Sequence, residues 1–177
     1  FTPIGNSSTR FTGSYDGDGY TIDSLFIDRP TTNYIGLFGY IGGDNSYTGS
    51  TTIQNLGLTN VSITGKEQVG ALVGFKRYGT LTVSNCYSTG SVTGTGEVGG
   101  FVGSRTNSPT VSNCFWDTET SGQASSDGGT GKTTAEMKTV TTFTDAGWDF
   151  EFETENGTDS YWDMDLSGAI NSGYSFL

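Results

Sequence analysis

Short runs of apolar and β-branched residues alternate along the chain with clusters of glycine, serine, threonine and asparagine. Such runs are typical of β-strands, and the clusters between them are typical of turns. Apolar residues at helical spacing do not extend over the length that a helical bundle requires. The pattern therefore predicts an all-β, turn-rich fold, and the length of 177 residues fits one domain.

Two sequence patterns recur together along the chain. The copies of the first pattern occupy 21–25, 52–56, 82–86 and 110–114, so that their first residues lie 31, 30 and 28 positions apart. The second pattern, rich in glycine and apolar residues, occupies 35–39, 69–74 and 98–103. Because both patterns keep one register through three repeats, the sequence predicts a repeat architecture.

The content of the repeat favours a parallel β-helix over other solenoids. The unit contains neither a leucine ladder nor long helix-forming runs. Equivalent residues of successive coils would stack about 4.8 Å apart. One interior ladder is expected from Ile22, Ile53, Val83 and Val111, and a second from Leu25, Leu56, Cys86 and Cys114. A polar corner ladder is expected from Asn55, Asn85 and Asn113, with Ser24 interrupting it in the first coil.

Cys86 and Cys114 occupy equivalent positions of consecutive coils. One interpretation is a disulfide or redox pair that joins the coils, and the other is two small buried side chains. The stacking distance lies within the Cα range of disulfides, but in-register parallel side chains point in the wrong direction for easy closure. We therefore expect free, buried thiols.

Segments 69–74 and 82–94 resemble the GLUG-motif repeats of large microbial surface proteins and adhesins. Segment 11–22 is similar to the stretch that precedes those repeats, and 115–122 with 131–138 is similar to the stretch that follows them. The resemblance covers roughly residues 1–150. It implies a right-handed parallel β-helix, an extracellular or cell-surface location as part of a longer chain, and no catalytic residues.

The expected organisation is one domain of three to four coils with terminal caps, because a solenoid exposes core and strand edges at both ends. Residues 1–20 would form an N-terminal cap or a degenerate first coil, and 118–177 would form a C-terminal cap. The repeats over 21–117 divide into 21–51, 52–81, 82–109 and the start of a last coil at 110–117.

The C-terminal segment contains two recognisable features. Thr133 and Glu136 have the spacing of a capping box that opens a short helix. An aromatic-rich stretch would cover the last coil or, alternatively, form a platform on which sugars stack. We expect the covering role, because a terminus must hide apolar surface. The aromatic residues are Trp148, Phe150, Phe152, Tyr161, Trp162, Tyr174 and Phe176.

The formal net charge of −11 and the absence of histidine narrow the function classes. An acidic surface repels phosphate backbones and anionic lipids, so nucleic acid is not an expected partner. No apolar run approaches the roughly 20 residues of a membrane span, so membrane insertion is not expected either. The expected partner is a glycan or protein on the surface of a host or neighbouring cell.

Asp16 and Asp18 alternate with glycine, as carboxylates do at the start of a calcium loop. An EF-hand would place a glutamate at the twelfth position, which Ile27 occupies here, so that geometry does not apply. A looser site that holds Ca²⁺ with Asp16, Asp18 and backbone carbonyls remains a hypothesis. The alternative is a tight turn in which aspartate and glycine serve the backbone. Ca²⁺ is the one cofactor that the sequence suggests.

Three other patterns carry candidate chemistry. Asp117 with Glu119, and Asp163 with Asp165, are pairs of carboxylates that glycoside hydrolysis would use, although a solvated acidic surface explains them as well. The segment 131–133 resembles the end of a phosphate-binding loop, but Ser126 stands where the first glycine is needed. A threonine column suggests a flat ice- or crystal-binding face, although outward threonine is ordinary in strands. Its members are Thr21, Thr52, Thr82 and Thr110.

These observations favour a non-catalytic binding module of a surface adhesin that recognises glycan or protein. The alternative is a structural stalk or spacer, because stacked coils form a stiff rod as well as an extended face. A polysaccharide-degrading β-helix enzyme is the least favoured of the three.

Overall fold

The computed structural model of the chain describes residues 1–107, 109–151, 156, 162–164 and 171–176. Strands dominate the described residues, and most of them pair in parallel, as expected for an all-β fold. Helices there are short and follow the last repeat. They are α1 (Thr118–Ser121), α2 (Thr134–Met137), α3 (Val140–Thr144) and the 3₁₀ turn η1 (Asn171–Gly173).

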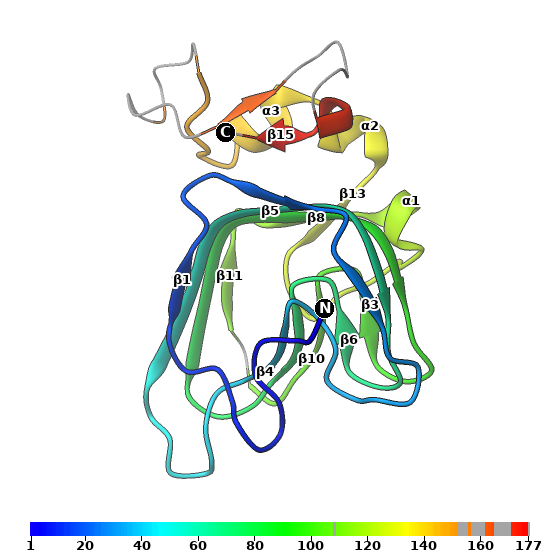
Figure 1. Ribbon diagram of the computed structural model, residues 1–177. Helices are drawn as coiled ribbons and strands as arrows, with labels where there is room; N and C mark the ends of the chain where they lie inside the picture. Colours follow the sequence, from blue (N-terminus) through cyan, green and yellow to red (C-terminus); the bar gives the residue numbers. More distant parts are fainter. Residues whose placement is uncertain (108, 152–155, 157–161, 165–170, 177) are drawn as a thin grey trace.

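Two long parallel strands, β5 (Ser50–Thr64) and β8 (Thr80–Thr93), form the centre of the main sheet. Three short strands of the first pass of the chain pair with β5: β1 (Ser14–Asp16), β2 (Thr21–Asp23) and β3 (Phe26–Asp28). The last pass contributes β11 (Thr110–Ser112) and β12 (Phe115–Asp117) beside β8, and β13 (Thr130–Lys132) beside β12. Figure 1 shows these passes stacked behind one another as an arch.

The chain returns beneath the arch in smaller parallel sheets built from the glycine-rich pattern. One contains β4 (Phe38–Ile41), β7 (Val73–Lys76) and β10 (Val102–Arg105), and another contains β6 (Val69–Gly70) and β9 (Val98–Gly99). Apolar side chains from the arch and from the returning strands meet in one continuous core. Glycines permit the close approach: a Cβ at Gly74 would lie 2.6 Å from the backbone nitrogen of Ile35.

The predicted asparagine ladder is confirmed at the corner of the arch. Asn55, Asn85 and Asn113 all have positive φ, at 54°, 50° and 54°, which asparagine tolerates better than most residues. The side-chain amide of Asn113 donates to Asn85 Oδ1 at 3.5 Å, and that of Asn85 donates to Asn55 Oδ1 at 3.4 Å. Each corner thus stacks on the equivalent corner of the preceding pass.

The predicted interior ladders are correct from the second pass onward. Ile53 pairs with Val83, and Val83 pairs with Val111. Leu56 pairs with Cys86. Phe115, which follows Cys114, pairs with Tyr87, which follows Cys86, so the two cysteines occupy equivalent positions. Both cysteines are free and buried, as expected, and burial raises the pKa of the Cys86 thiol well above its usual value.

The predicted register of the first pass is wrong. Tyr15, not Ile22, pairs with Ile53, whereas Ile22 pairs with Leu58. The cause is the turn after β1: five positions separate Asp16 from Thr21, but three separate their partners Gln54 and Gly57. Ser24 consequently lies at a different corner, and it does not interrupt the asparagine ladder: its backbone nitrogen donates to the Thr59 carbonyl.

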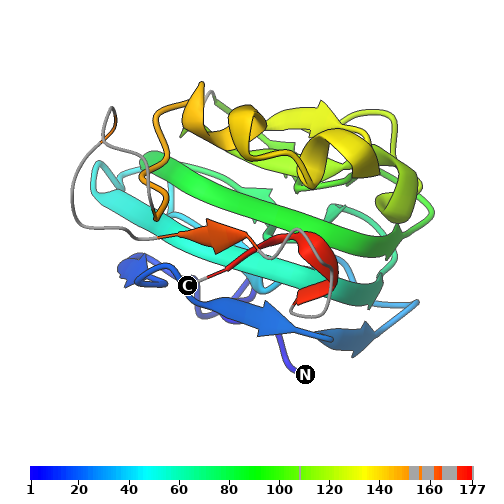
Figure 2. The same cartoon turned by 90° about the horizontal axis from the view of Figure 1, so that it is seen from above.

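The C-terminal segment forms a second layer on the outer face of the main sheet, as Figure 2 shows from above. It includes α2, α3 and the antiparallel pair β14 (Asp163–Met164) and β15 (Ser175–Phe176). At the end of the stack, β13 instead occupies the edge of β12. The aromatic stretch does pack on the last pass, where Trp148 contacts Phe115, but it also packs on Tyr87 of the preceding pass, so it covers a lateral face of the stack rather than its end.

A second core lies between this layer and the sheet. Tyr87 and Phe115 point outward from the arch into it, and Trp148, Trp162 and Tyr174 pack against them. Trp148, Phe150, Trp162 and Tyr174 are at most 4% exposed, so they do not form a sugar-stacking platform. Phe152, Tyr161 and the side chain of Phe176 lie outside what the structure describes.

The predicted capping box is confirmed at the start of α2. Thr133 Oγ1 accepts from the Glu136 backbone nitrogen, and Glu136 Oε2 accepts from the Thr133 backbone nitrogen at 2.8 Å. Two otherwise unpaired backbone donors are thereby satisfied in a helix of one turn.

Candidate functional site

The structure brings the predicted metal residues Asp16 and Asp18 together in a turn at the end of β1. Asp16 Oδ1 accepts from the Asp18 backbone nitrogen at 3.0 Å and from Asn55 Nδ2 at 3.1 Å. Its Oδ2 accepts from Gln54 Nε2 at 2.6 Å. Burial raises the pKa of Asp16, but these hydrogen bonds outweigh it and lower the pKa below the usual value.

These contacts describe a turn in which both carboxylate oxygens of Asp16 already have donors. Within the described parts of the chain, no three histidine, cysteine, aspartate or glutamate residues gather as a metal site would require. A calcium ion at Asp16 would compete with the amide donors of Gln54 and Asn55 for these oxygens. Calcium binding by Asp16 and Asp18 stays a prediction.

A groove of about 340 Å³ adjoins this turn. Its polar lining consists of a carboxylate, a carboxamide and two hydroxyls, from Asp16, Gln54, Ser14 and Thr52. The fifth lining residue is Tyr15, whose ring packs against Phe38 in the core. Because Tyr15 and Ile53 point into the core, the residues on either side of them point outward from the sheet. The groove therefore lies on the outer face of the wall that β1, β5, β8 and β11 form (Figure 1).

Two columns of polar side chains continue from the groove along this wall. One contains Ser14, Thr52, Thr82 and Thr110, in register across the four strands. The other contains Asp16, Gln54, Ser84 and Ser112. The predicted threonine column is thus correct for three members and wrong for Thr21, which pairs with Gly57 because of the register shift in the first pass.

The carboxylate pair Asp117 and Glu119 lies at the junction with the C-terminal layer. Asp117 is fully buried, and its Oδ1 accepts from the backbone nitrogens of Glu119 and Thr120 at the start of α1. Its Oδ2 accepts from Thr134 Oγ1 at 2.7 Å and from the Tyr174 hydroxyl at 2.9 Å. Oδ1 thus caps α1, and Oδ2 holds the C-terminal layer to the sheet.

The remaining candidates lie in the same segment. Asp163 in β14 accepts from the Met164 backbone nitrogen, and its predicted partner Asp165 lies outside the described residues. In the segment 131–133, Gly131 and Lys132 belong to β13, and Lys132 lies 3.6 Å from Glu136. Thr133 is the N-cap of α2.

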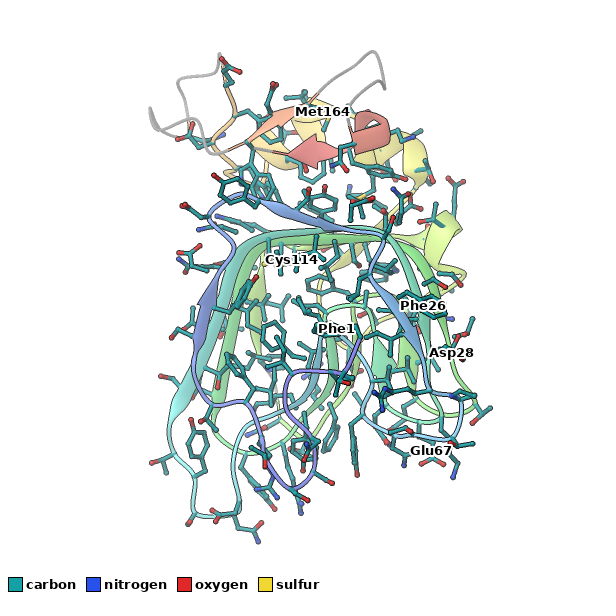
Figure 3. All side chains as sticks on the ribbon, viewed as in Figure 1. Phe1, Phe26, Asp28, Glu67, Cys114 and Met164 are labelled. Carbon is teal, nitrogen blue, oxygen red and sulfur yellow. The ribbon has the colours of Figure 1, made fainter. Side chains whose placement is uncertain are left out.

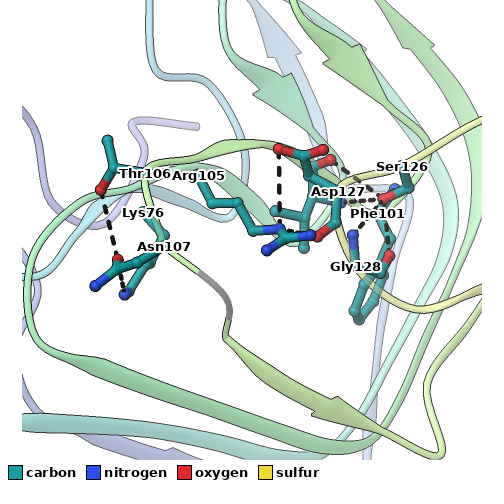
Figure 4. Close-up of polar contacts among 9 residues, drawn as sticks. Lys76, Phe101, Arg105, Thr106, Asn107, Ser126, Asp127 and Gly128 are labelled. Atoms are coloured by element: carbon teal, nitrogen blue, oxygen red, sulfur yellow. Dashed lines mark hydrogen bonds and ion pairs between the residues drawn. The ribbon is translucent and has the colours of Figure 1, made fainter.

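Sequence reasoning missed a buried lysine. Lys76 is 1% exposed, and its amine donates to the Gly79 carbonyl at 2.6 Å and to Asn107 Oδ1 at 2.5 Å. Figure 4 shows the contact with Asn107. Burial lowers the pKa of Lys76, and the nearby Arg105 lowers it further. The register with Ile41 in the neighbouring strand was the available signal, because that position points into the core.

Comparison with known proteins finds partial relatives. The chain is 40% identical over 107 residues to halomucin of Haloquadratum walsbyi, a match of 60% of this chain and 1% of that protein. It is 43% identical over 82 residues to a Gly-rich membrane protein of Evansella cellulosilytica, a match of 45% of this chain and 9% of that protein. No family model matches the chain, and neither does any solved structure.

The chain therefore spans only a small part of either relative. In the described part of the chain, no helix has the length and apolar character needed to cross a bilayer.

Proposed function

We propose that the chain is a glycan-binding module of a long cell-surface protein, built as a short right-handed parallel β-helix. The parallel, in-register passes of the main sheet support a β-helix, and the resemblance to GLUG-motif repeats supports its hand. The relatives, one named a halomucin and one a membrane protein, support a surface location. Because both relatives are much longer than the segment that matches this chain, the comparison supports a role as one module of a long protein.

The groove at Asp16 and its two polar columns carry the proposal. Sugar hydroxyls both donate and accept hydrogen bonds, and the hydroxyl, carboxamide and carboxylate groups of the groove complement them. The columns repeat the same chemistry about every 4.8 Å along the wall. A linear polysaccharide that lies along the wall would meet this chemistry in each pass. No covalent step is assigned, because the two carboxylates at Asp117 and Glu119 hold the C-terminal layer.

A glycan array, run with calcium and again with a chelator, tests this function. We expect binding to neutral polysaccharides that Gln54→Ala and Thr82→Val weaken. The matched control is Ser91→Ala, an exposed serine of β8 on the opposite wall of the arch. Binding that needs calcium and disappears in Asp18→Ala would support the metal site. Binding that persists in the presence of chelator would show that glycan binding does not need the metal.

A stalk or spacer is the second candidate. The observation that favours it is the small share of each relative that the chain matches, 1% and 9%, which suits one unit of a long rod. A blank array in both buffers would favour the spacer over the glycan-binding module. In that case the search for a ligand would turn to protein partners.

A further inference from the structure

A second cavity, of about 160 Å³, lies between the N-terminal segment and the turn that follows β3. It is separate from the Asp16 groove and shares no lining residue with it. Figure 3 marks this side of the molecule by Asp28, at the end of β3, and by Glu67 in the next pass. The volume suits one sugar ring rather than a larger ligand, because sites for drug-sized molecules begin near about 300 Å³.

Arg29 is the charged residue among those that line this cavity. Its Nη2 donates to Thr2 Oγ1 at 2.9 Å. No ion pair joins Arg29 to a carboxylate among the described residues, although the chain carries 19 acidic residues. A guanidinium has five N–H donors in a planar fork, so most of this fork remains available to a carboxylate.

Two carboxamides complete the polar lining. Asn6 Oδ1 accepts from the backbone nitrogens of Ser8 and Thr9, which leaves its Nδ2 group as a donor. Asn33 Nδ2 donates to Glu67 Oε2 at 3.2 Å, which leaves its Oδ1 as an acceptor. The cavity thus offers one cation, one amide donor and one amide acceptor, each held by a contact within the protein.

Tyr34 lines the same cavity in a conformation that costs energy. Its φ is 63°, in the left-handed region that bulky residues rarely adopt. The ring packs against Tyr40 and Phe75, with centroids 4.9 and 5.4 Å away. Gly39 permits this arrangement, because a Cβ there would lie 2.6 Å from the Tyr34 carbonyl oxygen. Backbone strain of this kind is common at ligand sites.

We propose that this cavity binds the carboxylate-bearing ring of an acidic sugar, a uronic acid unit of a polysaccharide. The Arg29 fork takes the carboxylate, Asn6 and Asn33 take ring hydroxyls, and Tyr34 provides the apolar wall. The planar fork of Arg29 matches a carboxylate in a bidentate pair, whereas the acidic surface around it repels every anion, a uronate included, so this local pair has to supply the selectivity. The inference rests on the proposed glycan-binding function, but it uses none of the residues of the Asp16 groove.

Isothermal titration calorimetry of the whole chain with a galacturonate disaccharide tests the proposal. A neutral galactose disaccharide is the matched ligand. We expect the uronate to bind the parent protein. Arg29→Gln should lower the affinity for the uronate about tenfold to hundredfold, as loss of a charge-assisted hydrogen bond does. Arg29→Lys keeps the charge but loses the fork, and it should weaken binding as well.

Lys66→Gln is the control variant, because it removes one positive charge from a neighbouring, half-exposed side chain. Equal weakening by Lys66→Gln and Arg29→Gln would overturn the proposal, since general attraction would then explain binding. Neutral-glycan binding that Gln54→Ala weakens, without any uronate binding, would overturn the proposal and leave the proposed function intact. Absence of binding to any glycan would overturn both.

Discussion

Asn55 donates its side-chain amide to Asp16 across 3.1 Å, and this bond ends the asparagine ladder at the first pass of the chain. The next corner ends in the same way, because Asn60 Nδ2 donates to Asp23 Oδ1 at 2.8 Å. A carboxylate accepts but does not donate, so the hydrogen bonds do not continue beyond the aspartate at either corner. The two negative charges also lie on a free strand edge, where charge discourages unwanted pairing.

Replacement of Asp16 by alanine should destabilise the protein by about 1 kcal/mol, because three donors lose an acceptor at an exposed site. Asp16→Asn should lose less stability than Asp16→Ala, since its Oδ1 can still accept from Asn55 and from the Asp18 backbone. Urea unfolding followed by circular dichroism measures both. An unchanged unfolding midpoint in Asp16→Ala would show that the ladder does not need its terminal acceptor.

The same carboxylates predict acid sensitivity. Hydrogen bonds from Thr59, Ser24 and Asn60 lower the pKa of Asp23, and the pKa of Asp16 is also lowered. The stability that these groups contribute is present above the unfolded value, about 3.9, and is lost as pH falls through the lower folded value. Unfolding midpoints should therefore decline below about pH 4, and decline less in the double variant Asp16→Asn/Asp23→Asn.

Tyr87 should control the attachment of the C-terminal layer. Its hydroxyl donates to the Ser175 carbonyl and accepts from Asn171 Nδ2 at 3.1 Å. Tyr87→Phe should cost about 1–2 kcal/mol, and Tyr87→Ala about 3–5 kcal/mol through the cavity that it creates. Tyr20→Ala is the control, because that ring is 61% exposed.

Tryptophan fluorescence gives the direct measurement, since Trp148 and Trp162 are buried beside Tyr87. A red shift of emission in Tyr87→Ala under native conditions would report that the layer has loosened. Emission identical to that of the parent protein would mean that the layer holds without this contact.

The sequence predicted those features that repeat and missed those that depend on a single loop or a fold-back. The stacking of Ile53 on Val83, and of Asn85 on Asn55, follows from a pattern that recurs in register. The register of the first pass was not predicted, because its turn Gly17 to Tyr20 is two residues longer than the equivalent stretch of the next pass. Such an insertion shifts the pairing partner of every residue that follows.

The lateral position of the C-terminal layer was likewise not predictable. Tyr87 lies in a strand whose other outward residues are polar, and one outward aromatic does not indicate what covers it. Gly57 gives a retrospective signal, because a Cβ there would meet the Tyr87 ring at 2.6 Å. The Arg29 cavity combines residues 2–6 with 29–35, and neither segment has a recognisable motif.

Lys76 makes stability depend on pH in the alkaline range. Burial lowers its folded pKa below the usual lysine value of 10.5, so the folded state binds fewer protons than the unfolded state between the two values. Stability should therefore rise as pH increases toward 10.5. Lys76→Met should abolish this rise and be neutral or stabilising near pH 7, because it removes a buried charge whose hydrogen-bond partners among the described residues are neutral.

Asn107→Ala separates the effect of the buried charge of Lys76 from the effect of its hydrogen bonds. It leaves the Lys76 amine buried with one fewer acceptor, and it should cost about 1–3 kcal/mol near pH 7. Lys66→Met, at a half-exposed lysine, is the control for loss of charge. Thermal melts between pH 7 and pH 10 measure all four proteins. A parent protein whose stability falls throughout that range would contradict the assignment.

Salt should stabilise the protein, since a net charge of −11 on a compact chain repels itself. Screening lengths fall from about 30 Å at 0.01 M salt to about 3 Å at 1 M, so the melting temperature should increase most steeply at low ionic strength. The double variant Asp28→Asn/Glu151→Gln removes two exposed charges and should show a smaller increase. Sucrose, which stabilises without screening, is the control solute. If sodium chloride raised the melting temperature of the parent and the variant equally, preferential exclusion rather than charge repulsion would account for the effect.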